Sequence, residues 1–233
     1  MLDGAVRAAN PRPADNASRD TKKNYAEALS NRFAETMAKD LRERGLMGCC
    51  PDPSTGGVEK EFAGGIGAKQ VDVSWSKDTA GLILGISIKT INFPDPRTQN
   101  YQKNLVNRRG DMLTEAVTLH RRFPYAVLAG FFFFHSGAAE DGNIRRDSTF
   151  LNAHRRLRMF TGRTDPGSRR DEQFERLYIG LYETNPQPSV RLFRVGQPDM
   201  EVAWEQVVSE LLDMVEERNP DHFVHRHGKL ANA

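Results

Sequence analysis

Two neighbouring segments of this 233-residue chain carry side chains that could bind a metal ion and a phosphate. Residues 69–76 alternate polar and apolar side chains and include Asp72, and residues 82–89 do the same and include Ser87 and Lys89. Alternation at period two with β-branched residues predicts two strands, and the turn-forming residues between them predict a hairpin. A hairpin that closes symmetrically puts Asp72 opposite Ser87, with Lys89 diagonal to Asp72 on the same face.

The predicted register decides which side chains share a face. Symmetric closure is centred between Thr79 and Ala80. It groups Val71, Val73 and Trp75 of the first strand on the face away from Asp72, and it groups Leu82, Leu84, Ile86 and Ile88 of the second strand away from Lys89. A slip of one residue would move every side chain to the other face and separate the acid from the lysine.

An acid and a lysine on neighbouring strands suit the hydrolysis of a phosphodiester bond. The Asp72 carboxylate could bind a divalent cation such as Mg²⁺, which favours oxygen ligands, and the backbone carbonyl of Ile88 could supply another oxygen. Such a cation lowers the pKa of a bound water and stabilises charge on the phosphate. Lys89 could orient or deprotonate that water, or hold a phosphate oxygen. One carboxylate alone is a weak metal site, so this chemistry needs a second acid.

These residues resemble the core motif of the PD-(D/E)XK nuclease superfamily, the restriction-endonuclease-like fold. That motif has an acid on one strand and an acid-X-Lys on the next, and Asp72 and Lys89 match its first and last positions. Ser87 departs from the motif, because it stands where the second acid is expected and a serine is a poor cation ligand. The resemblance covers about residues 21–135 and implies a Mg²⁺-dependent endonuclease, with Mn²⁺ able to substitute.

Some restriction enzymes of this superfamily carry Ser-X-Lys and take the missing acid from the following helix. Glu115 fits that role, because it falls at the edge of the apolar stripe of a helix predicted over residues 101–122. Glu35 is the second candidate, because its helix, predicted over residues 21–44, often contributes an acid in this superfamily. Two glutamates before the hairpin, Glu59 and Glu61, rank third.

Basic residues are unevenly distributed although the net charge is only +2. Residues 145–170 hold eight arginines against two aspartates, whereas residues 201–217 hold six acids and no base. This asymmetry suggests an anionic partner such as nucleic acid. We expect a phosphate-backbone clamp from Arg145, Arg146, Arg155, Arg156 and Arg158, and a phosphate contact from Arg108 with Asn104 beside it. The alternative is that both groups are solvated surface.

The order of predicted elements indicates an α/β fold with a central mixed sheet flanked by helices, as the restriction-endonuclease-like core has. Helices are predicted over 21–44, 101–122, 148–160 and 200–217, and strands over 69–76, 82–89, 125–134, 176–183 and 189–195. We expect a disordered arm over residues 1–20, one nuclease-like domain over 21–218 and a flexible tail over 219–233.

The composition favours a cytoplasmic protein. No apolar run is long enough to span a bilayer, and the N-terminus lacks the apolar segment of a signal peptide. The only cysteines, Cys49 and Cys50, are adjacent, so they form neither a disulfide framework nor a zinc motif, and a reducing compartment is expected.

The leading hypothesis is therefore an endonuclease that hydrolyses DNA. The resemblance further implies bacterial restriction or anti-phage defence, a homodimer because cutting both strands needs two sites, and a defence-system partner protein. Two alternatives remain open. One is a catalytically inactive nucleic-acid-binding protein on a nuclease-like fold, with Ser87 marking the lost acid. The other is an RNA-directed or small-molecule hydrolase on the same fold.

Overall fold

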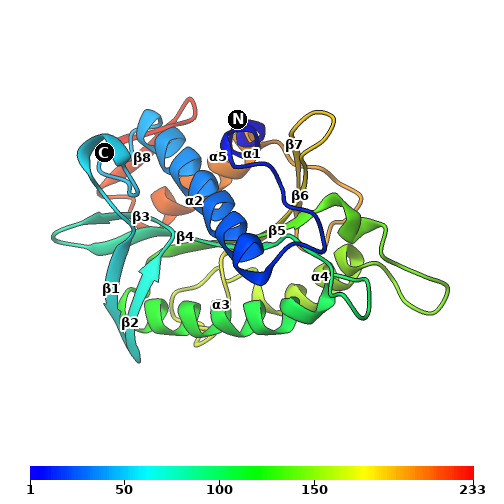
Figure 1. The fold of residues 1–233 in the computed structure, drawn as a ribbon. Coiled ribbons are helices and arrows are strands. Elements are labelled where there is room, and N and C mark those ends of the chain that lie inside the picture. Colours follow the sequence, from blue (N-terminus) through cyan, green and yellow to red (C-terminus); the bar gives the residue numbers. More distant parts are fainter.

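A five-stranded mixed sheet forms the centre of this chain in a computed structural model that describes residues 1–233 (Figure 1). Its strands, in spatial order, are β3 (Val73–Lys77), β4 (Gly81–Ile91), β5 (Val127–His135), β6 (Arg176–Glu183) and β7 (Ser189–Arg194). The three central strands run parallel, and the two outer strands run antiparallel to their neighbours. The predicted α/β class, with a mixed sheet flanked by helices, is confirmed.

Helices cover both faces of the sheet (Figure 1). One face carries α1 (Leu2–Ala8), α2 (Arg19–Glu43) and α5 (Trp204–Arg218), and the other carries α3 (Gln102–Arg122) and α4 (Thr149–Leu157). Short 3₁₀ turns occur at Pro53–Thr55, Ser136–Ala139 and Arg158–Phe160. None of the helices combines the length and the apolarity that crossing a membrane requires.

The apolar run in β5 is explained by burial on both faces of the sheet. Phe131 and Phe133 join the core beneath α2 and α5, whereas Phe132 and Phe134 join the core against α3 and α4. A strand that is covered on both sides needs apolar residues at every position rather than at alternate ones. The predicted strand over residues 125–134 is therefore the middle of the sheet.

A small separate hairpin precedes the sheet and packs on α3. It consists of β1 (Lys60–Gly64) and β2 (Gly67–Val71), paired antiparallel. Gly64 permits the contact, because a Cβ there would lie 2.3 Å from the Thr118 Cγ2 atom. The Gly65 N–H donates to the Thr118 carbonyl at 2.8 Å. The Gly-rich segment therefore fixes the hairpin against the helix, which the sequence pattern did not reveal.

Both ends of the chain are ordered, so the expected disordered arm and flexible tail are corrected. Leu2 and Val6 of α1 are buried in the core shared with α2. Beyond residue 219, β8 (Phe223–Arg226) pairs with β9 (Lys229–Asn232), and Phe223 and Leu230 join the same core. Each segment is held by two or three apolar side chains, too few to stand out in a polar sequence.

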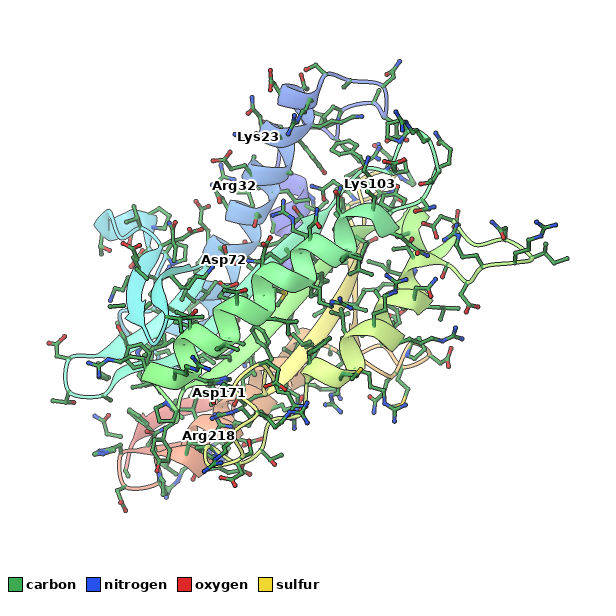
Figure 2. The ribbon with its side chains drawn as sticks, turned by 90° about the horizontal axis from the view of Figure 1, so that it is seen from below. Lys23, Arg32, Asp72, Lys103, Asp171 and Arg218 are labelled. Carbon is green, nitrogen blue, oxygen red and sulfur yellow. The ribbon has the colours of Figure 1, made fainter.

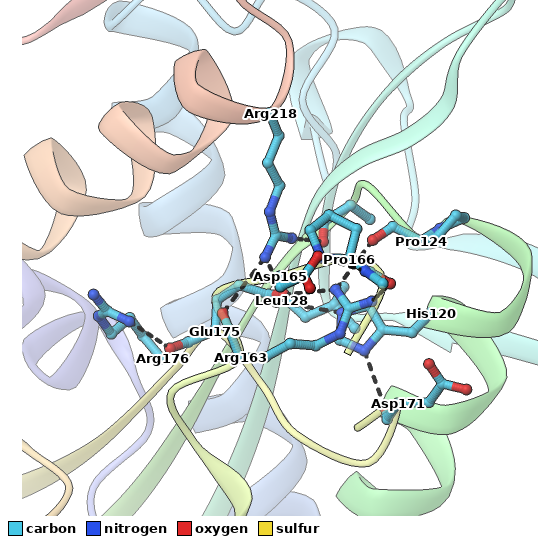
Figure 3. A network of polar contacts seen from close by, with 12 residues as sticks. His120, Pro124, Leu128, Arg163, Asp165, Pro166, Asp171, Glu175, Arg176 and Arg218 are labelled. Atoms are coloured by element: carbon cyan, nitrogen blue, oxygen red, sulfur yellow. Dashed lines mark hydrogen bonds and ion pairs between the residues drawn. The ribbon is translucent and has the colours of Figure 1, made fainter. Parts of the chain in front are cut away.

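A buried ion network connects the C-terminal ends of α3 and α5 with the segment that precedes β6 (Figure 3). The Glu175 carboxylate lies 3.1 Å from Arg163, 2.7 Å from Arg218 and 3.3 Å from His120. It also accepts the Leu128 N–H at 2.6 Å. Arg163 is thus a structural residue of the basic segment 145–170, because both side chains of its pair with Glu175 are completely buried.

Candidate active site

The hairpin of β3 and β4 brings Asp72 to the predicted position. Val73 pairs with Ile86, so the next position of the same register sets Asp72 opposite Ser87. The pairing slips by one residue between Trp75 and Ser76, where a bulge interrupts the ladder. The turn is therefore centred on Thr79 rather than between Thr79 and Ala80. On the side of the bulge away from the turn, from Trp75 to Asp72, the pairing has the predicted register.

The bulge also changes which side chains share a face. Ile83 packs with Leu84 in the core beneath α2, whereas Leu82 packs in the core against α3. The predicted grouping of Leu82 with Leu84 is therefore wrong at that one position. The extra residue lies between them and reverses the alternation at the turn end of the strand.

A bend at Asp72 divides the predicted strand 69–76 into β2 and β3. Val71 and Val73, predicted to share a face, consequently belong to different cores. The bend directs the Asp72 carboxylate toward β4, where it accepts the Ile88 N–H at 2.5 Å. The N–H and C=O of one residue in a strand point to the same side, so the Ile88 carbonyl also faces Asp72.

Lys89 lies between two carboxylates. Its ammonium nitrogen is 3.3 Å from Glu115 Oε2 and 3.7 Å from Asp72 Oδ2. Glu115 projects from the buried side of α3 and reaches across the sheet, and the nearby Ser87 hydroxyl acts to lower the pKa of its carboxyl group. Three side chains singled out with Asp72, namely Ser87, Lys89 and Glu115, are thus brought together by the fold.

The charges of this cluster alter one another's proton affinity. Burial raises the pKa of Glu115, and the negative charge of Asp72 adds to that effect, while Lys89 opposes it. Burial alone would lower the pKa of Lys89, but Glu115 and Asp72 outweigh it and the pKa is raised. The cluster holds two carboxyl groups to one ammonium group, a composition that favours the binding of a cation when both carboxyl groups are ionised.

The cluster opens into a large polar cleft between the N-terminal halves of α2 and α3. The cleft has a volume of about 1410 Å³, and only five of its 29 lining residues are hydrophobic. Asp72, Ile88 and Lys89 line its floor, whereas Glu115 lies beneath Lys89 and does not reach the surface of the cleft. Small-molecule sites are usually about 300–1,000 Å³ and mostly apolar, so this cleft is larger and more polar than is usual for them.

The other candidate acids lie around the same cleft. Glu35 lines it, but its carboxylate is paired with Arg32 at 2.8 Å and makes no contact with Asp72 or Lys89. Glu59 also lines it, and burial together with the nearby Asp72 raises the pKa of Glu59. Glu61 does not line it. The geometry thus favours Glu115 as the acid closest to Lys89, with Glu59 as a neighbour.

The predicted nucleic-acid residues fall into two places. Asn104 and Arg108 line the cleft beside the acid–lysine cluster, as expected. The arginines of the 145–170 segment do not line it. Arg146 binds Asp141, and Arg155 binds Asp147. Of the five arginines predicted to form the clamp, the other three, Arg145, Arg156 and Arg158, are exposed and make no ion pair.

Sequence reasoning missed the basic residues that do line the cleft. Arg19, Lys22 and Lys23 lie on the first turn of α2, and Lys103 lies on the first turn of α3 (Figure 2). Positive side chains at a helix N-terminus are electrostatically unfavourable, because they face the positive end of the helix dipole. Basic residues at the starts of two predicted helices could therefore have indicated an anion-binding site, because their placement becomes favourable when an anion binds between the helices.

Comparison of this chain with family models, with curated proteins and with solved structures finds no match.

Proposed function

We propose that this chain is a metal-dependent endonuclease that hydrolyses phosphodiester bonds of DNA. The observation that carries the proposal is the position of Lys89 between the carboxylates of Asp72 and Glu115, at the floor of a polar cleft. An excess of carboxylate over ammonium in a partly buried site is unfavourable unless a cation joins it. The resemblance of Asp72 and Lys89 to the PD-(D/E)XK motif gives the same interpretation.

The residues fit Mg²⁺, with Mn²⁺ as a substitute. Asp72, Glu115 and the Ile88 carbonyl would hold the ion, although no three Asp, Glu, His or Cys side chains are grouped as a metal cage. Mg²⁺ is commonly bound by one or two carboxylates together with water and substrate phosphate, so a cage is not required. When bound, the ion would activate a water and stabilise charge on the phosphate.

The protein's own side chains have separate parts in this chemistry. Lys89 would hold a non-bridging phosphate oxygen and orient the attacking water, because its ammonium group lies between the two carboxylates. Ser87 would keep the Glu115 carboxylate turned toward Lys89. Arg108 and Asn104 would hold the phosphates beside the scissile one.

Incubation of the protein with supercoiled plasmid and Mg²⁺, Mn²⁺ or EDTA tests this function. We expect nicked or linear product with either metal and none with EDTA. A chain that leaves the plasmid intact under all three conditions overturns the proposal. Lys89→Ala should abolish cleavage, and Lys77→Ala, at the exposed end of β3, is the matched control that should retain it.

A second candidate is a nucleic-acid-binding protein without catalysis. It is favoured by Ser87, which occupies the position of the second acid, and by the burial of Glu115 beneath Lys89. This alternative predicts plasmid retention in a gel that is the same with EDTA and with Mg²⁺, and no cleavage. The same experiment therefore separates the two.

The cellular role, oligomeric state and partner of the chain are proposed only from its resemblance to the PD-(D/E)XK superfamily. We propose that it acts in the bacterial cytoplasm in restriction or anti-phage defence, as a homodimer, with a further defence protein as a partner. Sedimentation with and without duplex DNA tests the homodimer, which would be wrong if the chain stays monomeric in both.

A further inference from the structure

The 141–147 loop is a projecting turn that the function proposed above does not use. It follows β5 and the 3₁₀ turn after it, at the carboxyl edge of the parallel strands, and it extends away from the body (Figure 1). Ligands of open α/β sheets bind at that edge. The position of the loop alone therefore makes it a candidate for contact with a substrate.

The base of the loop is rigidly built. The buried Asp141 carboxylate accepts the N–H of Thr149 at 2.6 Å and the N–H of Tyr101 at 3.0 Å. The Arg146 guanidinium donates to the Asp141 and Asp147 carbonyl oxygens. These bonds join the loop to the first residues of α3 and α4, so the tip is held in a defined direction.

The tip is a closed two-residue turn. Asn143 and Arg146 exchange backbone hydrogen bonds of 2.8 and 3.0 Å, and the Asn143 side chain accepts the Arg145 N–H at 2.9 Å. Ile144 and Arg145 form the apex. Ile144 is completely exposed, and the Arg145 guanidinium has no partner within the chain. The rigid turn therefore presents an apolar side chain and an unpaired guanidinium side by side, where both can contact the same partner.

The loop stands beside the cleft. Tyr101, whose N–H Asp141 accepts, directly precedes the first turn of α3, where Lys103 and Asn104 line the cleft. The hydrogen-bonded base of the loop is thus two positions along the chain from the lining of the cleft.

The charge of the cleft is balanced, so basic side chains outside it would add to the phosphate contacts made within it. Six basic side chains line it, namely Arg19, Lys22, Lys23, Lys89, Lys103 and Arg108. Six acidic side chains line it as well, namely Glu27, Glu35, Glu59, Asp72, Asp95 and Asp111. The cleft is therefore electrically balanced, whereas binding to duplex DNA is supported by an excess of positive charge against the phosphates.

We infer that the 141–147 loop is a wedge for the minor groove of duplex DNA, with Ile144 inserted at a base step and Arg145 in the groove beside it. This inference rests on the proposed function for its ligand. Proteins that bend DNA insert a single apolar side chain between base pairs in this way, and arginine is the side chain that narrow minor grooves attract.

The test is a bending and binding measurement in EDTA, on a duplex labelled with a donor and an acceptor at its two ends. We expect the wild type to raise energy transfer, and Ile144→Ala to lose that rise and bind about tenfold more weakly. Arg145→Ala should lower the slope of log affinity against log salt by about one. Ile66→Ala, at the exposed tip of the β1–β2 hairpin, is the matched control and should behave as wild type.

Three results would overturn the wedge. They are wild-type binding without bending, bending that persists in Ile144→Ala, and no binding of duplex at all. A change of sedimentation in Ile144→Ala without a change in bending would also overturn it, in favour of contact with a second copy of the chain. Cleavage with Mg²⁺ is measured separately, so a chain that bends DNA but does not cut it contradicts the nuclease and leaves the wedge standing.

Discussion

The ammonium of Lys89 lies 3.3 Å from the carboxylate of Glu115, although 26 positions separate them and they come from a strand and a helix. This contact selects Glu115 among the acids around the cleft. It also relates the function to the fold, because Glu115 reaches Lys89 only when α3 packs across the sheet.

Replacing Glu115 by Gln should reduce metal-dependent cleavage by at least about 100-fold, because the amide cannot supply the anionic ligand. The side chain keeps its shape and the folded state should be retained. Glu35→Gln is the matched control in the same cleft, and it should change the rate by no more than about threefold. Plasmid cleavage rates measure both, and a larger loss in Glu35→Gln would assign the acid to α2.

As the pH is lowered, this site should begin to lose metal affinity at a higher pH than a site built from carboxylates of ordinary pKa does. The ionised form of Glu115 binds the cation, and burial raises the pKa of Glu115, so protons compete with the metal sooner as the pH is lowered. Calorimetric titration of Mn²⁺ across a pH series measures this. Glu115→Gln should remove the dependence, and an unchanged pH profile in that variant would contradict the assignment.

Loss of the buried ion network should destabilise the fold. Glu175→Gln leaves Arg163 and Arg218 without a buried counter-charge, which costs about 3–5 kcal/mol of unfolding free energy. Glu172→Gln, which breaks the exposed pair with Arg170, should cost less than about 1 kcal/mol. Urea unfolding of both variants measures this. Equal losses of unfolding free energy would show that the buried network stabilises the fold no more than an exposed ion pair does.

The same network predicts a sign for stability against pH. Burial alone would raise the pKa of Glu175, but the His120 hydrogen bond and the charge of Arg218 outweigh it, and the folded-state pKa is lowered. The contribution of Glu175 is therefore present above its unfolded pKa and is lost as the pH falls through the folded pKa. Wild type should lose more stability on acidification than Glu175→Gln, and parallel curves would disprove this.

A methyl group at Gly64 should displace the β1–β2 hairpin from α3. The Cβ would lie 2.5 Å from the Thr118 carbonyl oxygen, and such a clash costs about 1–3 kcal/mol. Because β2 leads directly into Asp72, Gly64→Ala should also lower cleavage. Gly110→Ala is the matched control, since nothing lies within 4 Å of its Cβ, and in the interior of α3 it should stabilise by about 0.5–1 kcal/mol.

The basic first turn of α2 should contribute to DNA binding. Lys23→Glu reverses an exposed charge that lines the cleft, and we expect weaker binding with a smaller salt dependence. Lys39→Glu, on the same helix but outside the cleft, is the control. Equal effects of the two substitutions would indicate a general charge effect rather than a binding surface.

Patterns that repeat along the chain were enough to predict the main elements. Large apolar side chains recur every four residues along α2 and are all buried on its inner side, namely Tyr25, Leu29, Phe33, Met37 and Leu41. Similar periodicity located α3, alternation located β4, and a continuous apolar run located β5. The Asp72–Ser87 register was also predicted, although a bulge that no local pattern indicates was needed to produce it.

Features that depend on distant contacts could not be predicted. The β1–β2 hairpin exposes most of its residues and shows no clear alternation, so its strands are defined by packing on α3. Leu2 and Val6 are buried only because α2 and β7 lie beside them. The basic residues that line the cleft likewise come from two helices that are far apart in sequence, and only the fold brings their first turns to the same cleft.

The central claim is that the Asp72 carboxylate is catalytic, and Asp72→Asn tests it most directly. The asparagine oxygen can still accept the Ile88 N–H, so the hairpin should keep its geometry while the negative charge is lost. The measurement is the single-turnover rate of plasmid cleavage in Mg²⁺, with Asp78→Asn in the exposed turn as the control. We expect Asp72→Asn to be at least about 1,000-fold slower than wild type and Asp78→Asn to be unchanged. Cleavage by Asp72→Asn at the wild-type rate would contradict the account.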